Sequence, residues 1–219
     1  MNLQFVPART DRSPMTVLCL GAHSDDIEIG CGASIIKLVR SRVRVNIVWI
    51  VFSGDRQRAH EARASARLFL QRTASARVEL HDFRESYFPT HVGEIKDVFE
   101  ELKTTTKPDL IFTHTAKDTH QDHRVLCELT WNTFRSHTIL EYEIPKYDGD
   151  TGSPNVFIEL DRKLIDIKTR YLMRCFATQR DRHWFTGETF LGLARLRGIQ
   201  CAAPGGFAEA FYGRKLSIL

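Results

Sequence analysis

Short apolar runs alternate along the chain with segments whose apolar residues recur at helical spacing. Runs rich in β-branched and aromatic residues predict strands, and a period of ~3.6 residues predicts helices. The predicted strands span residues 17–20, 43–52, 76–80, 110–113, 138–144 and 156–160. The predicted helices span residues 30–39, 57–70, 91–103, 122–134, 161–175 and 188–197.

This alternation favours βαβ units with right-handed crossovers. We therefore expect an α/β protein, a Rossmann-like layered α/β/α sandwich with a mostly parallel sheet and a small C-terminal extension. Residues 1–14 are expected to form an N-terminal tail and residues 15–219 a single domain. Ligands of such sheets bind beyond the carboxyl ends of the strands, which directs attention to the loops after residues 20 and 113.

Composition narrows the class of protein. Of the 219 residues, 42% are hydrophobic and 26% are charged, values that exclude a wholly disordered chain or a collagen-like fibre. The net charge is only +4 and no dense basic run occurs, so we expect no nucleic-acid partner. No apolar run approaches the ~20 residues needed to cross a bilayer, so we expect no membrane span.

The cysteines and the first residues of the sequence indicate the cellular compartment of the protein. Five dispersed cysteines, with no CxxC pair, fit a reducing environment better than a disulfide framework. The opening sequence MNLQFVPARTDRSP lacks the apolar stretch of a secretory signal. A cytoplasmic protein is therefore expected.

The loop after the first strand reads GAHSDDIEIGCGA and brings together His23, Asp25 and Asp26. Two adjacent carboxylates at a strand end repel each other unless a positive charge lies close to them. A bound divalent cation would supply that charge. The glycines of this loop do not have the GxGxxG or phosphate-loop spacing, so a nucleotide-binding loop is not expected.

The loop after the strand at 110–113 reads FTHTAKDTHQDHR and holds His114, Asp118, His120, Asp122 and His123. If a helix begins within this loop, His120 and His123 lie on one helix face. Mixed histidine and carboxylate ligands are typical of catalytic zinc sites. The two loops together therefore predict a zinc site.

The two motifs resemble those of a known family. AHSDDIEIG and HQDH are similar to the AHPDDE-type and HxDH signatures of the PIG-L/LmbE-like zinc-dependent N-deacetylases, and they lie roughly a hundred residues apart as in that family. The SGD sequence that begins at Ser53, followed by Arg58 and Glu61, resembles a weaker family region. The ending AEAFYGRKL, residues 208–216, resembles a family C-terminal segment.

The resemblance implies a role for each motif residue. The implied metal ligands are His23, Asp26 and His123, with Zn²⁺ as cofactor. Asp25 would be the general base, and His120 would stabilise the oxyanion or protonate the leaving amine. Asp122, which we group with these catalytic residues, would orient a neighbouring histidine.

The chain departs from the family pattern at two positions. Ser24 replaces the usual proline, which removes no ligand. The acidic residue that usually follows the Asp pair is displaced by one position to Glu28, which is either a hydrogen-bond acceptor behind the site or an exposed side chain.

The resemblance implies hydrolysis of an N-acetyl or other N-acyl group on an amino sugar, often an N-acetylglucosamine conjugate. Candidate substrate contacts, all in or near loops after strands, are Arg56, Arg84, Tyr142 and Lys146. Two alternatives stay open: a non-catalytic metal-dependent carbohydrate-binding protein, and an amidase acting on a non-sugar N-acyl amine. A homo-oligomer is also left open.

Overall fold

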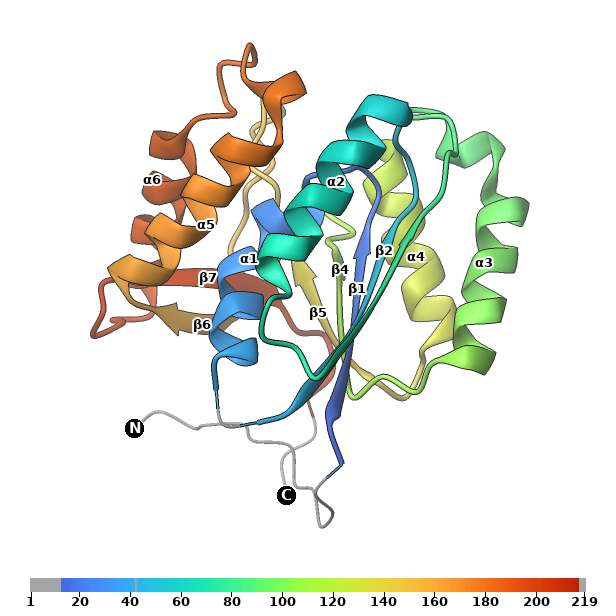
Figure 1. The fold of residues 1–219 in the computed structure, drawn as a ribbon, viewed down its shortest axis with the longest axis horizontal. Coiled ribbons are helices and arrows are strands. Elements are labelled where there is room, and N and C mark those ends of the chain that lie inside the picture. The colour runs from blue at the N-terminus through green and yellow to red at the C-terminus, as the bar shows by residue number, and fades with distance from the viewer. Residues whose placement is uncertain (1–12, 42, 217–219) are drawn as a thin grey trace.

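The computed structural model describes residues 13–41 and 43–216. Its strands form one sheet in the order β3-β2-β1-β4-β5-β7-β6 (Figure 1). The strands are β1 (Met15–Gly21), β2 (Val45–Val51), β3 (Ser75–Leu80), β4 (Leu110–His114), β5 (Thr138–Tyr142), β6 (Val156–Leu160) and β7 (Phe207–Tyr212). The helices are α1 (Asp26–Val39), α2 (Arg56–Phe69), α3 (Val92–Thr105), α4 (Gln121–Thr133), α5 (Arg162–Cys175) and α6 (Gly187–Gln200), with short 3-10 turns η1 (Phe88–Thr90) and η2 (Ala177–Gln179).

The mostly parallel α/β architecture expected from the sequence is confirmed. Strands β1 to β5 pair in parallel, whereas β7 runs antiparallel to both β5 and β6. The expected C-terminal extension corresponds to α6 and β7, and β7 is an integral strand of the sheet rather than an appendage. Of the predicted N-terminal tail, residues 1–12 lie outside the described part of the chain.

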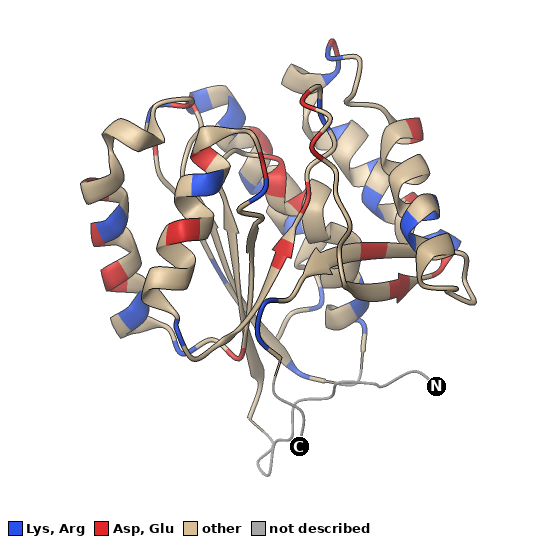
Figure 2. Ribbon diagram, turned by 180° about the vertical axis from the view of Figure 1, so that it is seen from behind, with Lys and Arg blue, Asp and Glu red and all other residues tan. Residues whose placement is uncertain are grey.

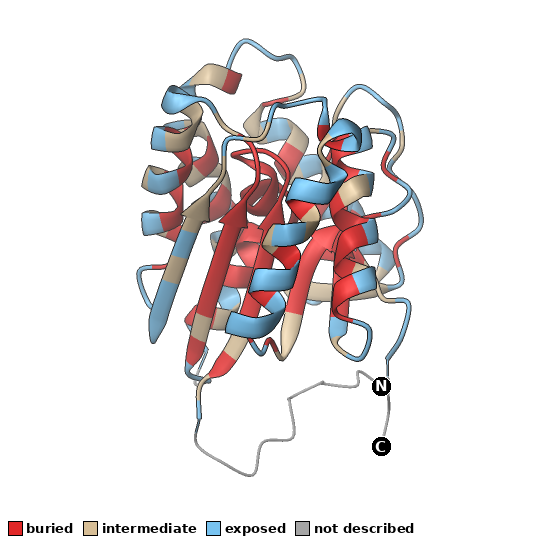
Figure 3. Ribbon diagram, turned by 90° about the vertical axis from the view of Figure 1, so that its right-hand side faces the viewer, coloured by how far each residue is buried: buried red, intermediate tan, exposed pale blue. Residues whose placement is uncertain are grey.

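Two apolar cores lie on opposite faces of the sheet because successive residues of a strand point to opposite sides. Val17 and Cys19 of β1 pack into the core under α1, α2 and α5, while Leu18 and Leu20 pack into the core under α3 and α4. Helices therefore cover both faces, and the central strands are buried while the outer helix surfaces are exposed (Figure 3). None of the described helices is long and apolar enough to span a bilayer.

Helix α1 begins at Asp26, four residues before the helix predicted from apolar spacing. Carboxylates are favourable in the first turn of a helix, so Asp26 and Glu28 belong to the helix although they interrupt the apolar pattern. Gly30 is required in this helix because an added Cβ would lie 2.1 Å from the ring of Tyr142.

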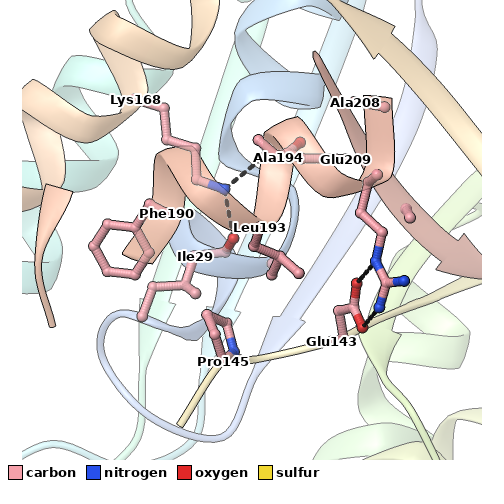
Figure 4. A pocket seen from close by; sticks show the side chains of 12 residues that line it. Ile29, Glu143, Pro145, Lys168, Phe190, Leu193, Ala194, Ala208 and Glu209 are labelled. Carbon is pink, nitrogen blue, oxygen red and sulfur yellow. Dashed lines mark hydrogen bonds and ion pairs between the residues drawn. The ribbon is translucent and has the colours of Figure 1, made fainter. Parts of the chain in front are cut away.

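Strand β7 is tied to α1 by a buried ionic contact. The backbone N–H groups of Ala33 and Ser34 donate to the Glu209 carboxylate at 3.0 and 2.7 Å. Lys168 of α5 donates to Glu209 at 2.6 Å and to the backbone oxygen of Ile29 at 2.5 Å (Figure 4). The Glu209 carboxylate and the Lys168 ammonium thus form hydrogen bonds with backbone groups in the middle of α1. These hydrogen bonds explain why the AEAF segment contains an acidic residue.

Candidate metal and catalytic site

The two motif loops meet at the carboxyl ends of the neighbouring strands β1 and β4. Strand β1 pairs with β2 on one side and with β4 on the other, so the order of the chain reverses at this point. Ligand sites of open α/β sheets form at such switch points. Figure 2 shows acidic segments at the upper ends of the central strands and in the loops above them.

Three donor atoms converge between the loops. The Nδ1 atom of His23 lies 3.3 Å from Oδ2 of Asp26 and 3.1 Å from Nε2 of His123. The same Asp26 oxygen lies 3.5 Å from His123 Nε2. All three residues are buried. The structure therefore brings together the three ligands that the family resemblance implies.

This triangle fits a tetrahedral zinc ion. With metal–ligand distances of ~2.0–2.1 Å, tetrahedral geometry separates neighbouring ligand atoms by about 3.3 Å. The three observed separations, 3.1, 3.3 and 3.5 Å, lie around that value. Two imidazole nitrogens 3.1 Å apart also require a proton or a cation between them.

Two carboxylates fix which nitrogen each histidine presents. Asp122 lies 3.2 Å from His23 Nε2, which leaves Nδ1 for the triangle. Asp118 lies 2.8 Å from His123 Nδ1, which leaves Nε2 for the triangle. Carboxylate partners of this kind orient metal-binding histidines. Asp122 was expected to contact a neighbouring histidine and here contacts His23, whereas the contact of Asp118 with His123 was not anticipated.

The two histidines differ in their electrostatics. Burial disfavours the charged form of His23, but the carboxylates of Asp26 and Asp122 outweigh burial and raise the pKa of His23 to about 10. Burial and the neighbouring His114 lower the pKa of His123 to about 3, against the attraction of Asp26. His123 is therefore neutral at physiological pH, as a metal ligand must be.

Asp25 lies beside the triangle and is buried. Burial and the neighbouring charge of Asp26 raise its pKa to about 6, and Arg58 opposes the increase. An Arg58 nitrogen lies 3.3 Å from the Asp25 carboxylate and another lies 2.5 Å from Glu85. The sequence indicated Arg58 only through a weak family region. Glu61 of the same region instead accepts hydrogen bonds from the backbone and hydroxyl of Thr178.

His120 lies at the start of α4, where its Nδ1 accepts the backbone N–H of Asp122 at 3.3 Å. In the neutral ring the proton is then on Nε2. Burial and the neighbouring His23 lower the pKa of His120, which favours the neutral form. Its ring centroid lies 4.8 Å from that of His23 and 4.6 Å from that of His123. His120 therefore presents an N–H group next to the triangle of donor atoms.

Sequence reasoning did not assign a role to His114. This residue ends β4 and is fully buried, with its Nε2 3.2 Å from Oδ2 of Asp26 and its ring stacked 3.8 Å from that of His123. Besides the triangle, two further groups of donor atoms within the described residues lie close enough together to hold a metal, namely His23, His120 and His123, and Asp26, His114 and His123. The signals for His114 were its place at the exit of a strand and its membership of the histidine- and aspartate-rich loop.

The four residues expected to contact substrate occupy different environments. Tyr142 is fully buried and its hydroxyl donates to the backbone oxygen of Leu20 at 2.6 Å, so it supports the site from inside the core. Lys146 is held between Asp118 and Asp150, at 2.9 and 2.8 Å. The two remaining candidates, both on the surface, are Arg56 and Arg84.

Glu28 is fully buried on α1, so the exposed alternative is excluded. The Ser65 hydroxyl lies beside its carboxylate and favours the charged form. Burial raises the pKa of Glu28 well above its usual value. Ser24, which replaces the family proline, is also buried, and its hydroxyl lies 3.4 Å from the backbone oxygen of Ser53.

A histidine and carboxylate donor set with a further carboxylate beside it, at a switch point of an α/β sheet, is typical of metal-dependent hydrolases. Residues 18–134, more than half of the chain, match the sequence family described as PIG-L, GlcNAc-PI de-N-acetylase. The chain therefore belongs to the PIG-L family of deacetylases, as its two motifs indicated.

Two of the proteins that are similar to this chain are named as deacetylases. The chain is 27% identical over 166 residues to the uncharacterized deacetylase YaiS of Escherichia coli, an alignment covering 72% of this chain and 89% of that protein. The N,N'-diacetylchitobiose deacetylase of Pyrococcus horikoshii superposes with a TM-score of 0.66 at 21% identity, over 90% of this chain and 83% of that one.

The same fold also carries a different reaction. GalB of Pseudomonas putida, a 4-carboxy-2-hydroxymuconate hydratase, superposes with a TM-score of 0.70 at 18% identity, over 94% of this chain and 98% of that one. At this level of identity the likeness concerns the fold alone. The reaction must therefore be argued from the family and from the site.

Proposed function

We propose that this chain is a zinc-dependent N-deacetylase that removes an N-acetyl or other N-acyl group from a small molecule or conjugate containing an amino sugar. The observation that carries the proposal is the triangle of His23, Asp26 and His123 with Asp25 at its side. The family description and the names of the similar deacetylases support an amide-cleaving reaction on a sugar.

His23, Asp26 and His123 would hold the metal, with Asp122 and Asp118 keeping the two imidazoles in the required tautomers. When bound, zinc would lower the pKa of a coordinated water to about 7 and polarise the acyl oxygen. His114, beside Asp26 and His123, would help to hold those two ligands in place.

Asp25 is assigned the role of general base. Its pKa of about 6 is matched to taking a proton from water near neutral pH. Arg58 contacts one of its oxygens and so limits the directions in which the carboxylate can turn. The remaining oxygen would face the attacking water.

His120 is assigned the role of oxyanion stabiliser. Because its Nδ1 accepts a backbone hydrogen bond, its Nε2 carries the proton and can donate to the acyl oxygen as negative charge develops. The proton that Asp25 takes from the attacking water would pass to the departing amine, because the neutral His120 ring keeps its single proton. The products would be a free amine and a carboxylate, acetate when the acyl group is acetyl.

Metal analysis combined with an acetate-release panel tests the proposal. The panel contains N-acetylated sugars, their nucleotide and glycoside conjugates, and N-acetylated amines without a sugar ring. We expect about one zinc per chain and acetate release from the sugar compounds. Release from the acyclic amines alone would favour a non-sugar amidase. Metal with sugar binding but no turnover would favour a binding protein, and no metal would overturn the proposed site.

A further inference from the structure

The segment that joins β3 to η1 contacts the catalytic side of the site. Glu85 lies in this segment and its carboxylate is 2.5 Å from Arg58. Arg58 in turn lies 3.3 Å from Asp25, the assigned base. The segment therefore reaches the base through a single intervening side chain.

The same segment also contacts the metal-binding side. The backbone N–H groups of Ser86 and Phe88 donate to the Asp122 carboxylate at 2.6 and 3.1 Å. Asp122 is the residue that orients His23. Tyr87 lies between two residues whose backbone amides bind the Asp122 carboxylate. The backbone of Tyr87 is therefore held at the edge of the site.

Ser86 adopts a left-handed backbone conformation, with φ of 66°. This conformation is unfavourable for a residue with a side chain, and such residues concentrate at functional sites. Here it accompanies a hydrogen bond from the Ser86 amide to Asp122. The side-chain amide of Gln121, next to Asp122, donates to the Ser86 backbone oxygen and further fixes the segment.

Tyr87 is 42% exposed, whereas the next residue, Phe88, is fully buried. The guanidinium carbon of Arg84 lies 3.6 Å from the centroid of the Tyr87 ring. Arg84 thus lies over one face of the ring, and part of the ring surface stays accessible. A fixed, accessible tyrosine beside a guanidinium offers both an apolar surface and hydrogen-bond donors.

We propose that Tyr87, with Arg84 stacked on it, is a binding platform for a pyranose ring of the substrate. The inference rests on the proposed function for its choice of ligand, because a sugar ring has an apolar face that packs on an aromatic ring and hydroxyl groups that accept from a guanidinium. The platform lies on the segment that holds Asp122 and contacts Arg58, so a ring seated there would carry its N-acyl group toward the metal-binding triangle.

Tyr147 provides a matched comparison. It is 67% exposed and lies on the segment between β5 and β6. Among the described residues, none forms a hydrogen bond or a ring contact with the Tyr147 side chain. If Tyr87 is a ring-binding platform, changing it to alanine should weaken binding of the sugar substrate. Changing Tyr147 to alanine should leave this binding unchanged.

Kinetics with two substrates test the platform. One substrate is a β-glycoside of N-acetylglucosamine, and the other is N-acetylethanolamine, which has no ring. For the Tyr87→Ala variant we expect KM for the glycoside to rise about tenfold, the effect of ~1.4 kcal/mol, with kcat changed by less than about twofold. KM for the acyclic substrate should stay unchanged, Tyr87→Trp should restore glycoside KM, and Tyr147→Ala should behave as wild type. An equal change of KM for both substrates would overturn the platform.

Binding without turnover separates this inference from the proposed function. Glucosamine, which has a free amine and cannot be deacetylated, is titrated against the wild type and the Tyr87→Ala variant by saturation-transfer NMR. Weaker binding by the variant supports the platform even if no substrate releases acetate, in which case only the deacetylase proposal fails. Equal binding by both proteins, or no binding by the wild type, overturns the platform.

Discussion

The carboxylate of Asp122 lies 3.2 Å from Nε2 of His23, although 99 positions of the sequence separate the two residues. This contact leaves Nδ1 of His23 facing Asp26 and His123. The same carboxylate is held by two backbone amides of the segment before α3. Asp122 therefore joins three separate parts of the chain at the metal-binding triangle.

The Asp122→Ala change should weaken zinc binding. It removes the partner that holds the His23 imidazole, and loss of such a partner lowers metal affinity by about 10–100-fold. Competition with a zinc chelator measures the effect. Asp166→Ala, which removes an exposed carboxylate paired with Arg162, serves as the control and should bind zinc as the wild type does. Unchanged affinity in the Asp122 variant would contradict the orienting role.

Asp25→Asn and Asp26→Asn should have different effects despite being neighbours. Asp25→Asn should retain zinc and lose most of its hydrolytic activity, because an amide cannot accept the proton of water. Asp26→Asn should lose zinc, because it removes a charged ligand from the triangle. Elemental analysis and acetate release are measured on both variants. Metal loss in the first and retention in the second would exchange the two assignments.

The sequence predicted the strand and helix order because apolar spacing reports which side of each element is buried. The family resemblance of its two motifs also implied His23, Asp26 and His123, whose donor atoms the structure brings together. The sequence did not reveal β7, whose Glu209 occupies a buried position that a hydrophobicity pattern assigns to an apolar residue. Nor did it reveal the contact of Ser86 with Asp122, because that contact is made by the backbone and depends on no particular side chain.

The Glu209→Ala change should strongly destabilise the fold. It leaves the buried ammonium of Lys168 without its carboxylate and two amides of α1 without their acceptor. Breaking one partner of a buried ion pair typically lowers the free energy of unfolding by about 3–5 kcal/mol. Urea unfolding measures the change. Arg162→Ala, which breaks an exposed pair with Asp166, should change stability by less than ~1 kcal/mol. Similar values for the two variants would contradict this account.

Zinc affinity should increase with pH. In the metal-free protein the carboxylates of Asp26 and Asp122 raise the pKa of His23 to about 10, so His23 is protonated at neutral pH. Coordination requires the neutral ring, so binding must release this proton. The release of the His23 proton should then raise the zinc affinity about tenfold per pH unit between pH 6 and 8. Calorimetric titration in buffers of different ionisation enthalpy counts the released protons. A pH-independent affinity with no proton release would show that His23 is neutral before zinc binds.

The two histidines of HQDH should separate metal binding from catalysis. The geometry alone permits His120 to join His23 and His123 around a metal, so the assignment of His120 as a hydrogen-bond donor to the oxyanion needs a direct test. His123 lies in the triangle and is held by Asp118, so His123→Ala should lower zinc affinity strongly. His120 instead presents an N–H group beside the triangle, so His120→Ala should retain zinc.

The same His120→Ala variant should lose about 10²–10³-fold in kcat, the usual effect of removing one oxyanion donor. Its KM should change little, because the hydrogen bond strengthens only as negative charge develops on the acyl oxygen. Chelator competition and steady-state kinetics on both variants decide between the two roles. Equal loss of zinc from both variants would make His120 a metal ligand. The proposed mechanism would then lack a hydrogen-bond donor to the oxyanion.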